Sequence, residues 1–185
     1  MIGILRYNAG NTGSVQRALV RLSIPSKIIK KPEELERMDG IIFPGAGAAG
    51  TTMQCLLETG WAKAIQSYKK PFLGLCLGMQ LLFEFSEEDS VECLGIIKGR
   101  VIELPDTLTK PHMGWNKLST GDYAYFVHSY VCEPTDPLVT TMKTAYGDDL
   151  CAGVQQENFF GVQWHPEKSG DVGDRYLLSF SELCK

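Results

Sequence analysis

Apolar and polar residues alternate in blocks along the first half of the chain, and these blocks predict strands and helices in turn. Between the apolar runs, Val15, Leu19 and Leu22 recur at near-helical spacing, and Thr12 or Ser14 is placed to cap that helix. Four strand–helix repeats of this kind predict an α/β fold, with a mostly parallel central sheet and helices on both faces. The apolar runs that predict buried parallel strands lie at residues 2–5, 26–30, 40–43 and 71–75.

The second half of the chain carries shorter β-like runs, separated by turn residues such as Gly121-Asp122. We expect them to extend the same sheet with antiparallel strands, and we expect residues 171–185 to close the chain as a helix. No linker, repeat or low-complexity segment interrupts the pattern, so we expect residues 1–185 to form a single domain. The β-like runs lie at residues 101–104, 117–118, 123–131, 138–144, 150–155 and 159–162.

Composition and charge are those of an ordinary globular protein. The chain is 44% hydrophobic with a net charge of −4, and no run rich in Lys and Arg favours nucleic acid or an acidic membrane. The first residues lack the basic and apolar regions of a signal peptide, and no apolar run approaches the roughly 20 residues of a membrane span. We therefore expect a cytoplasmic protein.

The cysteines and histidines do not show the spacings of a metal or disulfide site. Six cysteines are scattered without a C-x-x-C pair, and three histidines are present. We therefore expect a reducing compartment, no metal and no cofactor, with every cysteine except Cys76 packed as a small hydrophobe.

One segment, residues 71–80, runs from an apolar strand through Gly-Leu-Cys-Leu-Gly into a run with helical character. The pattern is that of a nucleophile elbow with Cys76 at its centre. Gly74 and Gly78 remove the β-carbons that would clash as the backbone reverses, and the sulfur would sit at a helix N-terminus, which favours a thiolate. The alternative is a buried core cysteine beside two packing glycines.

A second segment, Val162–Ser169, places His165 and Glu167 after an apolar strand. Pro166 biases His165 to an extended backbone, and residues two apart in an extended segment share one face. The Glu167 carboxylate is therefore predicted to hold the imidazole, as the third member of a catalytic triad does. Alone, the segment also fits a turn with a solvated His and Glu, but beside a cysteine elbow it favours nucleophilic catalysis.

An oxyanion formed by attack of Cys76 needs backbone N–H donors. The amide of Leu77, directly after the nucleophile, is one candidate. The loop 44–47, Pro-Gly-Ala-Gly, follows the third predicted strand and is the best source of a second donor, at Ala46. The alternative for this loop is an ordinary tight turn between a strand and a helix.

Together these segments resemble the class I (triad) glutamine amidotransferases. Residues 78–84, 111–116 and 125–130 narrow the resemblance to the glutaminase subunits of imidazole glycerol phosphate synthase in histidine biosynthesis, and Pro-His-Met-Gly-Trp-Asn at 111–116 is the most specific segment. The resemblance covers nearly the whole chain. It implies the flavodoxin-like class I glutamine amidotransferase fold.

The resemblance implies that Cys76 attacks the side-chain amide of L-glutamine, with His165 as base and then acid and Glu167 orienting it. It also implies a separate (β/α)8 cyclase subunit as partner, because such a barrel needs about 250 residues and this chain has no room for one. By position in the family motifs, the residues that hold glutamine are Gly47, Gln80, Glu88, Ser129 and Tyr130. The residues that face the cyclase are Asn8, Asn11, Trp115 and Lys168.

The chain departs from the family at Ala46, where the loop usually reads Pro-Gly-Val-Gly. Any residue except proline keeps the N–H donor. We hypothesise that the free chain hydrolyses glutamine poorly, and that docking of the loaded cyclase sets the Ala46 amide toward the oxyanion.

Three alternatives stay open. The same chemistry serves pyridoxal phosphate, anthranilate or GMP synthesis, against which residues 112–116 argue. A cysteine peptidase of similar fold shares the elbow, but Gln80 and the His165 segment favour glutamine. A non-catalytic flavodoxin-like module would use the glycine loops to bind a flavin or phosphate, and it predicts no loss of function in Cys76→Ala.

Overall fold

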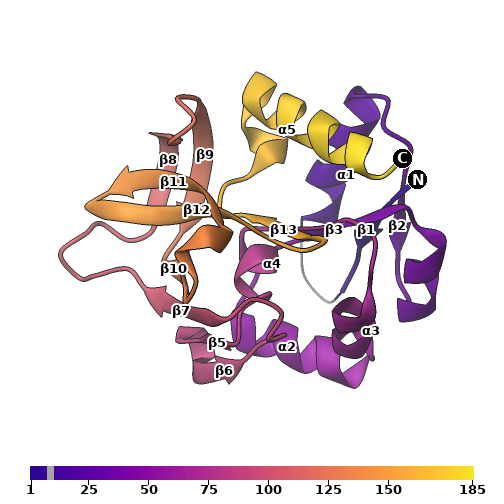
Figure 1. Ribbon diagram of the computed structural model, residues 1–185, viewed down its shortest axis with the longest axis horizontal. Helices are drawn as coiled ribbons and strands as arrows, with labels where there is room; N and C mark the ends of the chain where they lie inside the picture. Colours follow the sequence, from indigo (N-terminus) through magenta and orange to yellow (C-terminus); the bar gives the residue numbers. More distant parts are fainter. Residues whose placement is uncertain (8–10) are drawn as a thin grey trace.

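The structure, a computed structural model, describes residues 1–7 and 11–185 and is organised around a seven-stranded sheet (Figure 1). Its strand order is β11-β12-β13-β4-β3-β1-β2, and the five strands from β13 to β2 run parallel. The first four strands along the chain match the predicted apolar runs to within one residue at each end. The parallel strands are β1 (Ile2–Leu5), β2 (Ser26–Ile29), β3 (Gly40–Pro44), β4 (Phe72–Leu75) and β13 (Phe159–Val162).

Helices cover both faces of this sheet, as predicted (Figure 1). Consecutive strand residues point to opposite faces, so Ile4 packs into one hydrophobic core and Leu5 into the other. Burial on both sides explains why the parallel strands read as unbroken apolar runs. The helices α1 (Thr12–Arg21) and α5 (Gly170–Leu183) lie on one face, and α2 (Ala49–Glu58) and α3 (Trp61–Ser67) lie on the other.

The C-terminal half extends the sheet with only some of its strands. β11 (Thr140–Tyr146) and β12 (Asp148–Gln156) add antiparallel strands next to β13, as expected. The expectation that all the β-like runs join this extension is wrong, because four strands form one small sheet and two form another. The small sheets are β10 (Tyr130–Pro134), β7 (Gly99–Glu103), β5 (Phe85–Ser86) and β6 (Val91–Glu92) in that order, and β8 (His112–Lys117) with β9 (Tyr123–His128).

The predicted run 123–131 is divided between these two small sheets. Ser129 belongs to no strand, and the chain leaves the ladder of β8 before this residue and enters that of β7 after it. Alternation of apolar and polar residues predicts that strands exist, but it does not encode which strand each one pairs with. The break at Ser129 also turns Tyr130 toward the sheet end where β4 and β13 finish.

The β8–β9 hairpin has a buried face and an exposed face. His112 pairs with His128 on the buried side, whereas Trp115 pairs with Tyr125 on the other. Met113 and Trp115, two residues apart on β8, are 65% and 58% exposed. Because side chains alternate along a strand, the exposed face gathers apolar and aromatic groups that the chain itself does not cover.

Three further details bear on the predicted elements. The cap of α1 is Asn11, whose Oδ1 accepts from the Ser14 amide at 3.3 Å, so the expected caps Thr12 and Ser14 are wrong. The described residues contain no helix that is both long and apolar enough to cross a membrane.

Asn8, one of the expected interface residues, lies outside the described residues. The 3₁₀ segments among the described residues are Pro32–Arg37, Glu88–Ser90, Pro137–Val139 and Pro166–Lys168.

Candidate active site

Three neighbouring parallel strands end together and bring three loops to one point. Leu75 at the end of β4 lies in register with Pro44 at the end of β3 and with Val162 at the end of β13. The next residues along each chain segment, Cys76, Gly45 and Gln163, are therefore neighbours. This is the carboxyl edge of the parallel strands, where α/β proteins place their ligand sites.

The backbone reverses sharply at Cys76, as predicted for a nucleophile elbow. Its φ is 51° and its ψ is −111°, a left-handed conformation that is strained for a residue with a β-carbon. A β-carbon on Gly78 would lie 2.1 Å from the carbonyl oxygen of Phe43, and one on Gly74 would lie 2.4 Å from that of Gly78. The short helix α4 (Leu77–Gln80) is packed against β3 and β4 at distances that only glycine permits.

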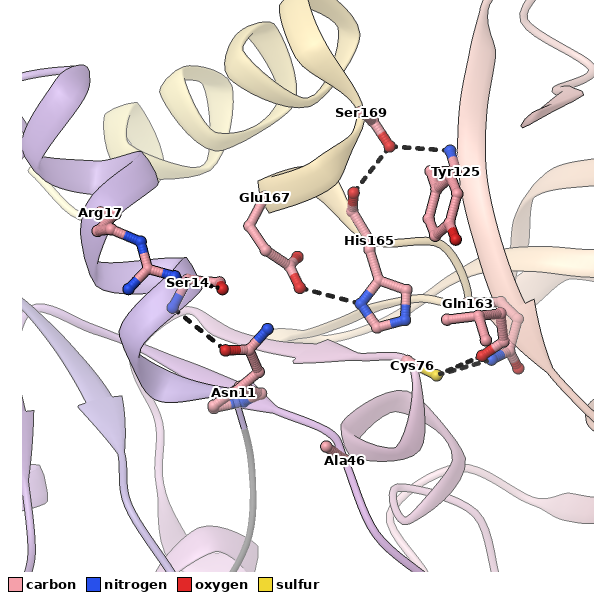
Figure 2. Close-up of polar contacts among 12 residues, drawn as sticks. Asn11, Ser14, Arg17, Ala46, Cys76, Tyr125, Gln163, His165, Glu167 and Ser169 are labelled. Atoms are coloured by element: carbon pink, nitrogen blue, oxygen red, sulfur yellow. Dashed lines mark hydrogen bonds and ion pairs between the residues drawn. The ribbon is translucent and has the colours of Figure 1, made fainter. Parts of the chain in front are cut away.

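His165 and Glu167 meet, but not through the extended segment that the sequence suggested. His165 is extended, with φ −105° and ψ 95°, as Pro166 predicts. The chain then turns into the 3₁₀ segment Pro166–Lys168, so the expectation of an extended backbone through Glu167 is wrong. The turn still brings Glu167 Oε1 to 3.0 Å from His165 Nδ1, and both side chains are buried (Figure 2).

The electrostatic surroundings of His165 favour its charged form. Burial opposes a charge, but the adjacent Cys76 sulfur and the Glu167 carboxylate outweigh it and raise the pKa of the imidazole to about 10. Among the described residues, no hydrogen-bond partner is found for His165 Nε2, which faces the pocket beside Cys76 (Figure 2). The free nitrogen is the one that can exchange a proton with the sulfur or with a reacting group.

Ser169 fixes the backbone around His165, and sequence reasoning assigned it no role. Its hydroxyl donates to the His165 carbonyl at 2.7 Å and accepts from the Tyr125 amide at 3.0 Å (Figure 2). The His165 amide donates in turn to the Tyr125 carbonyl at 2.9 Å. These bonds attach the backbone of His165 to β9. A serine three residues after Pro166 gives no sequence signal of this contact, because Tyr125 is remote in the chain.

A pocket of about 360 Å³ opens over Cys76 and collects most of the predicted site residues. Glu167 lies behind His165 rather than in the lining, and Trp115 lies on the hairpin face outside it. A larger hollow of about 790 Å³ lies at β7, β10 and the β11–β12 pair, away from Cys76. The predicted residues that line the smaller pocket are Asn11, Ala46, Gly47, Cys76, Leu77, Gln80, Glu88, Ser129, Tyr130, His165 and Lys168.

The two predicted oxyanion donors differ in what their amides contact. Leu77 opens α4, so its amide has no acceptor within its own helix. The Ala46 amide instead donates to the hydroxyl of Tyr7 at 3.4 Å. The same hydroxyl lies 3.1 Å from the Pro44 carbonyl and 3.3 Å from that of Ala46, so Tyr7 holds the loop in this arrangement. Tyr7 received no role from sequence reasoning.

Two of the predicted glutamine-binding residues already have partners within the chain. Glu88 Oε2 accepts from the Ala49 amide at 2.9 Å, at the first turn of α2, and burial raises the pKa of its carboxyl. Gln80 Nε2 donates to the Tyr130 carbonyl at 3.1 Å and to Gln163 Oε1 at 3.0 Å. Both amide hydrogens of Gln80 are thus used, and its Oε1 is the atom left for a ligand.

A pair of buried histidines stands behind Tyr130. His128 Nδ1 lies 2.8 Å from the Tyr130 carbonyl, and its Nε2 lies 3.0 Å from His112 Nδ1. Burial lowers the pKa of His128 to about 4 and also lowers the pKa of His112, so both rings are neutral at pH 7. A carbonyl only accepts, so His128 Nδ1 carries hydrogen and its Nε2 accepts from His112. Asn116 Nδ2 donates to the remaining nitrogen at 3.2 Å.

The remaining predicted interface residues border the exposed hairpin face. Lys168 Nζ lies 5.7 Å from the centroid of the Tyr125 ring, and Trp115 packs edge-on against the same ring at 6.1 Å. Lys168 also lines the pocket, as does Asn11. These contacts join the mouth of the pocket to the exposed face of the hairpin.

The other cysteines differ from Cys76 in their surroundings. Burial raises the pKa of Cys93 to about 12 and those of Cys151 and Cys184 to about 11, so these are protonated thiols at pH 7. Among the described residues, no group of three or more His, Cys, Asp or Glu side chains is arranged to hold a metal ion.

Comparisons with known proteins agree on one family. The family model described as Glutamine amidotransferase class-I matches residues 5–182. Imidazole glycerol phosphate synthase subunit HisH of Bacteroides fragilis (strain YCH46) is 40% identical over 196 residues, covering 98% of this chain and 99% of that protein. The protein of the same name from Exiguobacterium sibiricum is 44% identical over 188 residues, covering 98% and 95%. A crystal structure of a glutamine amidotransferase has a TM-score of 0.82 at 23% identity, covering 99% of this chain and 98% of that one, which shows the shared fold.

Proposed function

The chain belongs to the class-I glutamine amidotransferase family, and on this premise we propose that it is the glutaminase subunit of an imidazole glycerol phosphate synthase. In this role it hydrolyses L-glutamine to glutamate and ammonia as a single domain, residues 1–185. The observation that carries the proposal is the pocket in which Cys76 and the Glu167-bound His165 lie together, within a chain that aligns end to end with HisH proteins.

Cys76 is the proposed nucleophile. His165 takes the thiol proton, and its raised pKa favours this transfer. The sulfur attacks the side-chain carbonyl carbon of glutamine, and the resulting tetrahedral intermediate loses ammonia as the imidazolium returns the proton to the leaving nitrogen. Water, deprotonated by His165, then hydrolyses the glutamyl thioester and releases glutamate. Glu167 keeps the proton of His165 on Nδ1 and so leaves Nε2 for these transfers.

The proposed oxyanion donors are the amides of Leu77 and Ala46. Since the Ala46 amide is bound to Tyr7, the loop must turn before this donor can serve. We propose that docking of the partner provides that turn, so that the free chain hydrolyses glutamine slowly. The energy needed is small, because one hydrogen bond contributes about 1 kcal/mol net.

Glutamine is proposed to occupy the 360 Å³ pocket with its α-amino and α-carboxyl groups among Gly47, Gln80, Glu88, Ser129 and Tyr130. Gln80 would act through Oε1, because both of its amide hydrogens are bound within the chain. Glu88 would offer the carboxylate oxygen that does not accept from Ala49. A free ammonium group is the ligand group that these two oxygens suit.

The proposed partner is a (β/α)8 cyclase that receives the ammonia and makes imidazole glycerol phosphate and an aminoimidazole carboxamide ribotide. The exposed face of β8–β9 with Trp115, and the mouth of the pocket with Asn11 and Lys168, are the proposed docking surface. Asn8 is proposed for the same surface from its place in the sequence.

The experiment is a glutamate-release assay on the wild type and Cys76→Ala, alone and with the cyclase plus its nucleotide substrate. We expect slow release by the free wild type, strong stimulation by the loaded cyclase, and no release by Cys76→Ala in either case. Full turnover by the free chain would refute the docking step. Activity in Cys76→Ala would refute the triad, and stimulation by the amidotransferase partner of another pathway would reassign the acceptor.

A further inference from the structure

A buried glutamine that no predicted role includes contacts the sulfur of Cys76. Gln163 is 1% exposed, and its Nε2 lies 3.5 Å from Cys76 Sγ (Figure 2). Gln163 and His165 are two residues apart in the bend that follows β13, and both side chains reach Cys76 (Figure 2). The sulfur therefore lies between an imidazole and an amide that come from one short segment.

The orientation of this amide is fixed from its other end. Gln163 Oε1 accepts from Gln80 Nε2 at 3.0 Å, and Gln80 Nε2 also donates to the Tyr130 carbonyl at 3.1 Å. A backbone carbonyl only accepts, so Gln80 must present its NH₂ group on this side. That group donates, so Gln163 must present its oxygen to Gln80 and its NH₂ group to the sulfur. A flipped Gln163 would place two NH₂ groups against each other.

The Tyr130 carbonyl that anchors this arrangement is itself held in place. It also lies 2.8 Å from His128 Nδ1, which donates to it. The carbonyl thus has two donors on its two lone pairs, one from Gln80 and one from His128. Neither amide can rotate without leaving a buried donor or acceptor unpaired, so both orientations are fixed.

We propose that Gln163 is a positioning residue for the nucleophile: its N–H donates to the Cys76 sulfur and holds the thiolate form aimed into the pocket. The proposal rests on the proposed role of Cys76. The neutral thiol has an acceptor of its own in the Val127 carbonyl, at 3.8 Å. When His165 takes the proton, that contact is lost, whereas a hydrogen bond from Gln163 to a negatively charged sulfur becomes stronger. The same bond assists departure of the sulfur when water hydrolyses the thioester.

Two substitutions test this donor. Gln163→Met keeps the length of the side chain and removes the N–H. Gln163→Glu keeps an oxygen for Gln80 Nε2 and turns a carboxylate oxygen toward the sulfur. The matched control is Gln66→Met, which removes an amide bonded to the Leu94 carbonyl at 2.7 Å, away from the pocket.

The main measurement is the rate of Cys76 alkylation by iodoacetamide in the full chain without glutamine, followed by mass spectrometry of the peptide across pH 5–10. We expect the pH midpoint to rise by about one unit or more in Gln163→Met, and further in Gln163→Glu, because the hydrogen bond that stabilises the thiolate is lost. Gln66→Met should match the wild type. With the cyclase present, kcat should fall about tenfold or more in Gln163→Met while KM changes less than threefold.

A purely structural role would lower stability without moving the alkylation profile. Profiles of both Gln163 variants that superimpose on the wild type, with native circular dichroism, would therefore overturn the proposal. If Gln163→Met fails to fold, the alkylation profile of Gln163→Glu alone tests the proposal, because this variant keeps an acceptor for Gln80 Nε2. Retained glutaminase activity in Cys76→Ala would refute the proposed function instead, and the alkylation series does not depend on that activity.

Discussion

The pocket over Cys76 has two walls that are stabilised in different ways. The elbow wall, made of the loop after β3, the end of β4 and α4, is packed backbone to backbone, and Gly45, Gly74 and Gly78 allow the approach. The hairpin wall, made of the end of β9 and Tyr130, is held by side-chain hydrogen bonds that run from His128 in the pocket lining to His112 of β8 behind it. The glycine contacts of the first wall are fixed by sterics, and its Ala46 loop is held by a hydrogen bond to Tyr7. The second is fixed by proton positions, so it responds to pH.

The largest effect should come from the elbow wall. In Gly78→Ala the new β-carbon would lie 2.1 Å from the carbonyl oxygen of Phe43 in β3, so α4 and β3 must move apart. We expect a loss of stability of about 4 kcal/mol or more, measured as the denaturation midpoint or as loss of soluble protein. Gly13→Ala is the control, because its β-carbon would meet only the flexible Arg17 side chain at 3.3 Å. A stable, active Gly78→Ala would show that this wall is not sterically fixed.

The hairpin wall should weaken in acid. Native His128 stays neutral down to a pKa of about 4, whereas the unfolded chain takes up the proton near pH 6.5. The neutral ring therefore contributes fully to stability above pH 6.5, and this contribution is lost as the pH falls toward 4. At pH 5 the loss amounts to about 2 kcal/mol. We expect the unfolding free energy, measured in urea at pH 7.5 and pH 5, to fall by about 2 kcal/mol less in His128→Gln than in the wild type. If the unfolding free energy falls equally in the wild type and in His128→Gln, the titration of His128 is not the cause.

A smaller effect is expected where the elbow wall meets β1. Tyr7→Phe removes the acceptor of the Ala46 amide, so stability should fall by about 1 kcal/mol while glutamate release by the free chain rises severalfold. Tyr68→Phe is the matched control, since its buried hydroxyl donates to the Met38 carbonyl at 3.1 Å, away from the pocket. Unchanged release in Tyr7→Phe would mean that the Tyr7 contact does not restrain the loop.

The smallest effect on the isolated chain is expected on the outer face of the hairpin. Trp115 is 58% exposed, so Trp115→Ala should change the unfolding free energy by less than about 0.5 kcal/mol. Its effect should appear in titration calorimetry with the cyclase, as weaker binding by about tenfold or more. Leu57→Ala, 64% exposed on α2, should change neither quantity. Equal affinity of Trp115→Ala and wild type would place the docking surface elsewhere.

The same division explains what could be predicted from the sequence. The elbow wall depends on neighbours in the chain, because the glycines on both sides of Cys76 are a local signal. The proline after His165 is another local signal, and four of the five parallel strands follow from unbroken apolar runs. The Glu167 contact was predicted with the wrong backbone, because a 3₁₀ turn after Pro166 reaches the same place as an extended segment would.

The hairpin wall depends on pairs that lie far apart in the chain. His112 meets His128 only because β8 and β9 pair in one particular register, which the alternation of residues does not specify. The contacts of Ser169 with Tyr125 and of Tyr7 with Ala46 likewise join separate elements. In the sequence, Gln163 looks like one more residue at the end of a strand. The orientation of its amide follows only from its contact with Gln80, which is bonded to the Tyr130 carbonyl.

The exposure of Trp115 has one practical consequence. The other two tryptophans, Trp61 and Trp164, are fully buried, so their fluorescence is shielded from dissolved quenchers. Iodide or acrylamide should reach the indole of the hairpin and leave the other two bright. A partner that covers the hairpin would protect Trp115 from the quencher. Binding could therefore be followed by tryptophan fluorescence without labelling the chain.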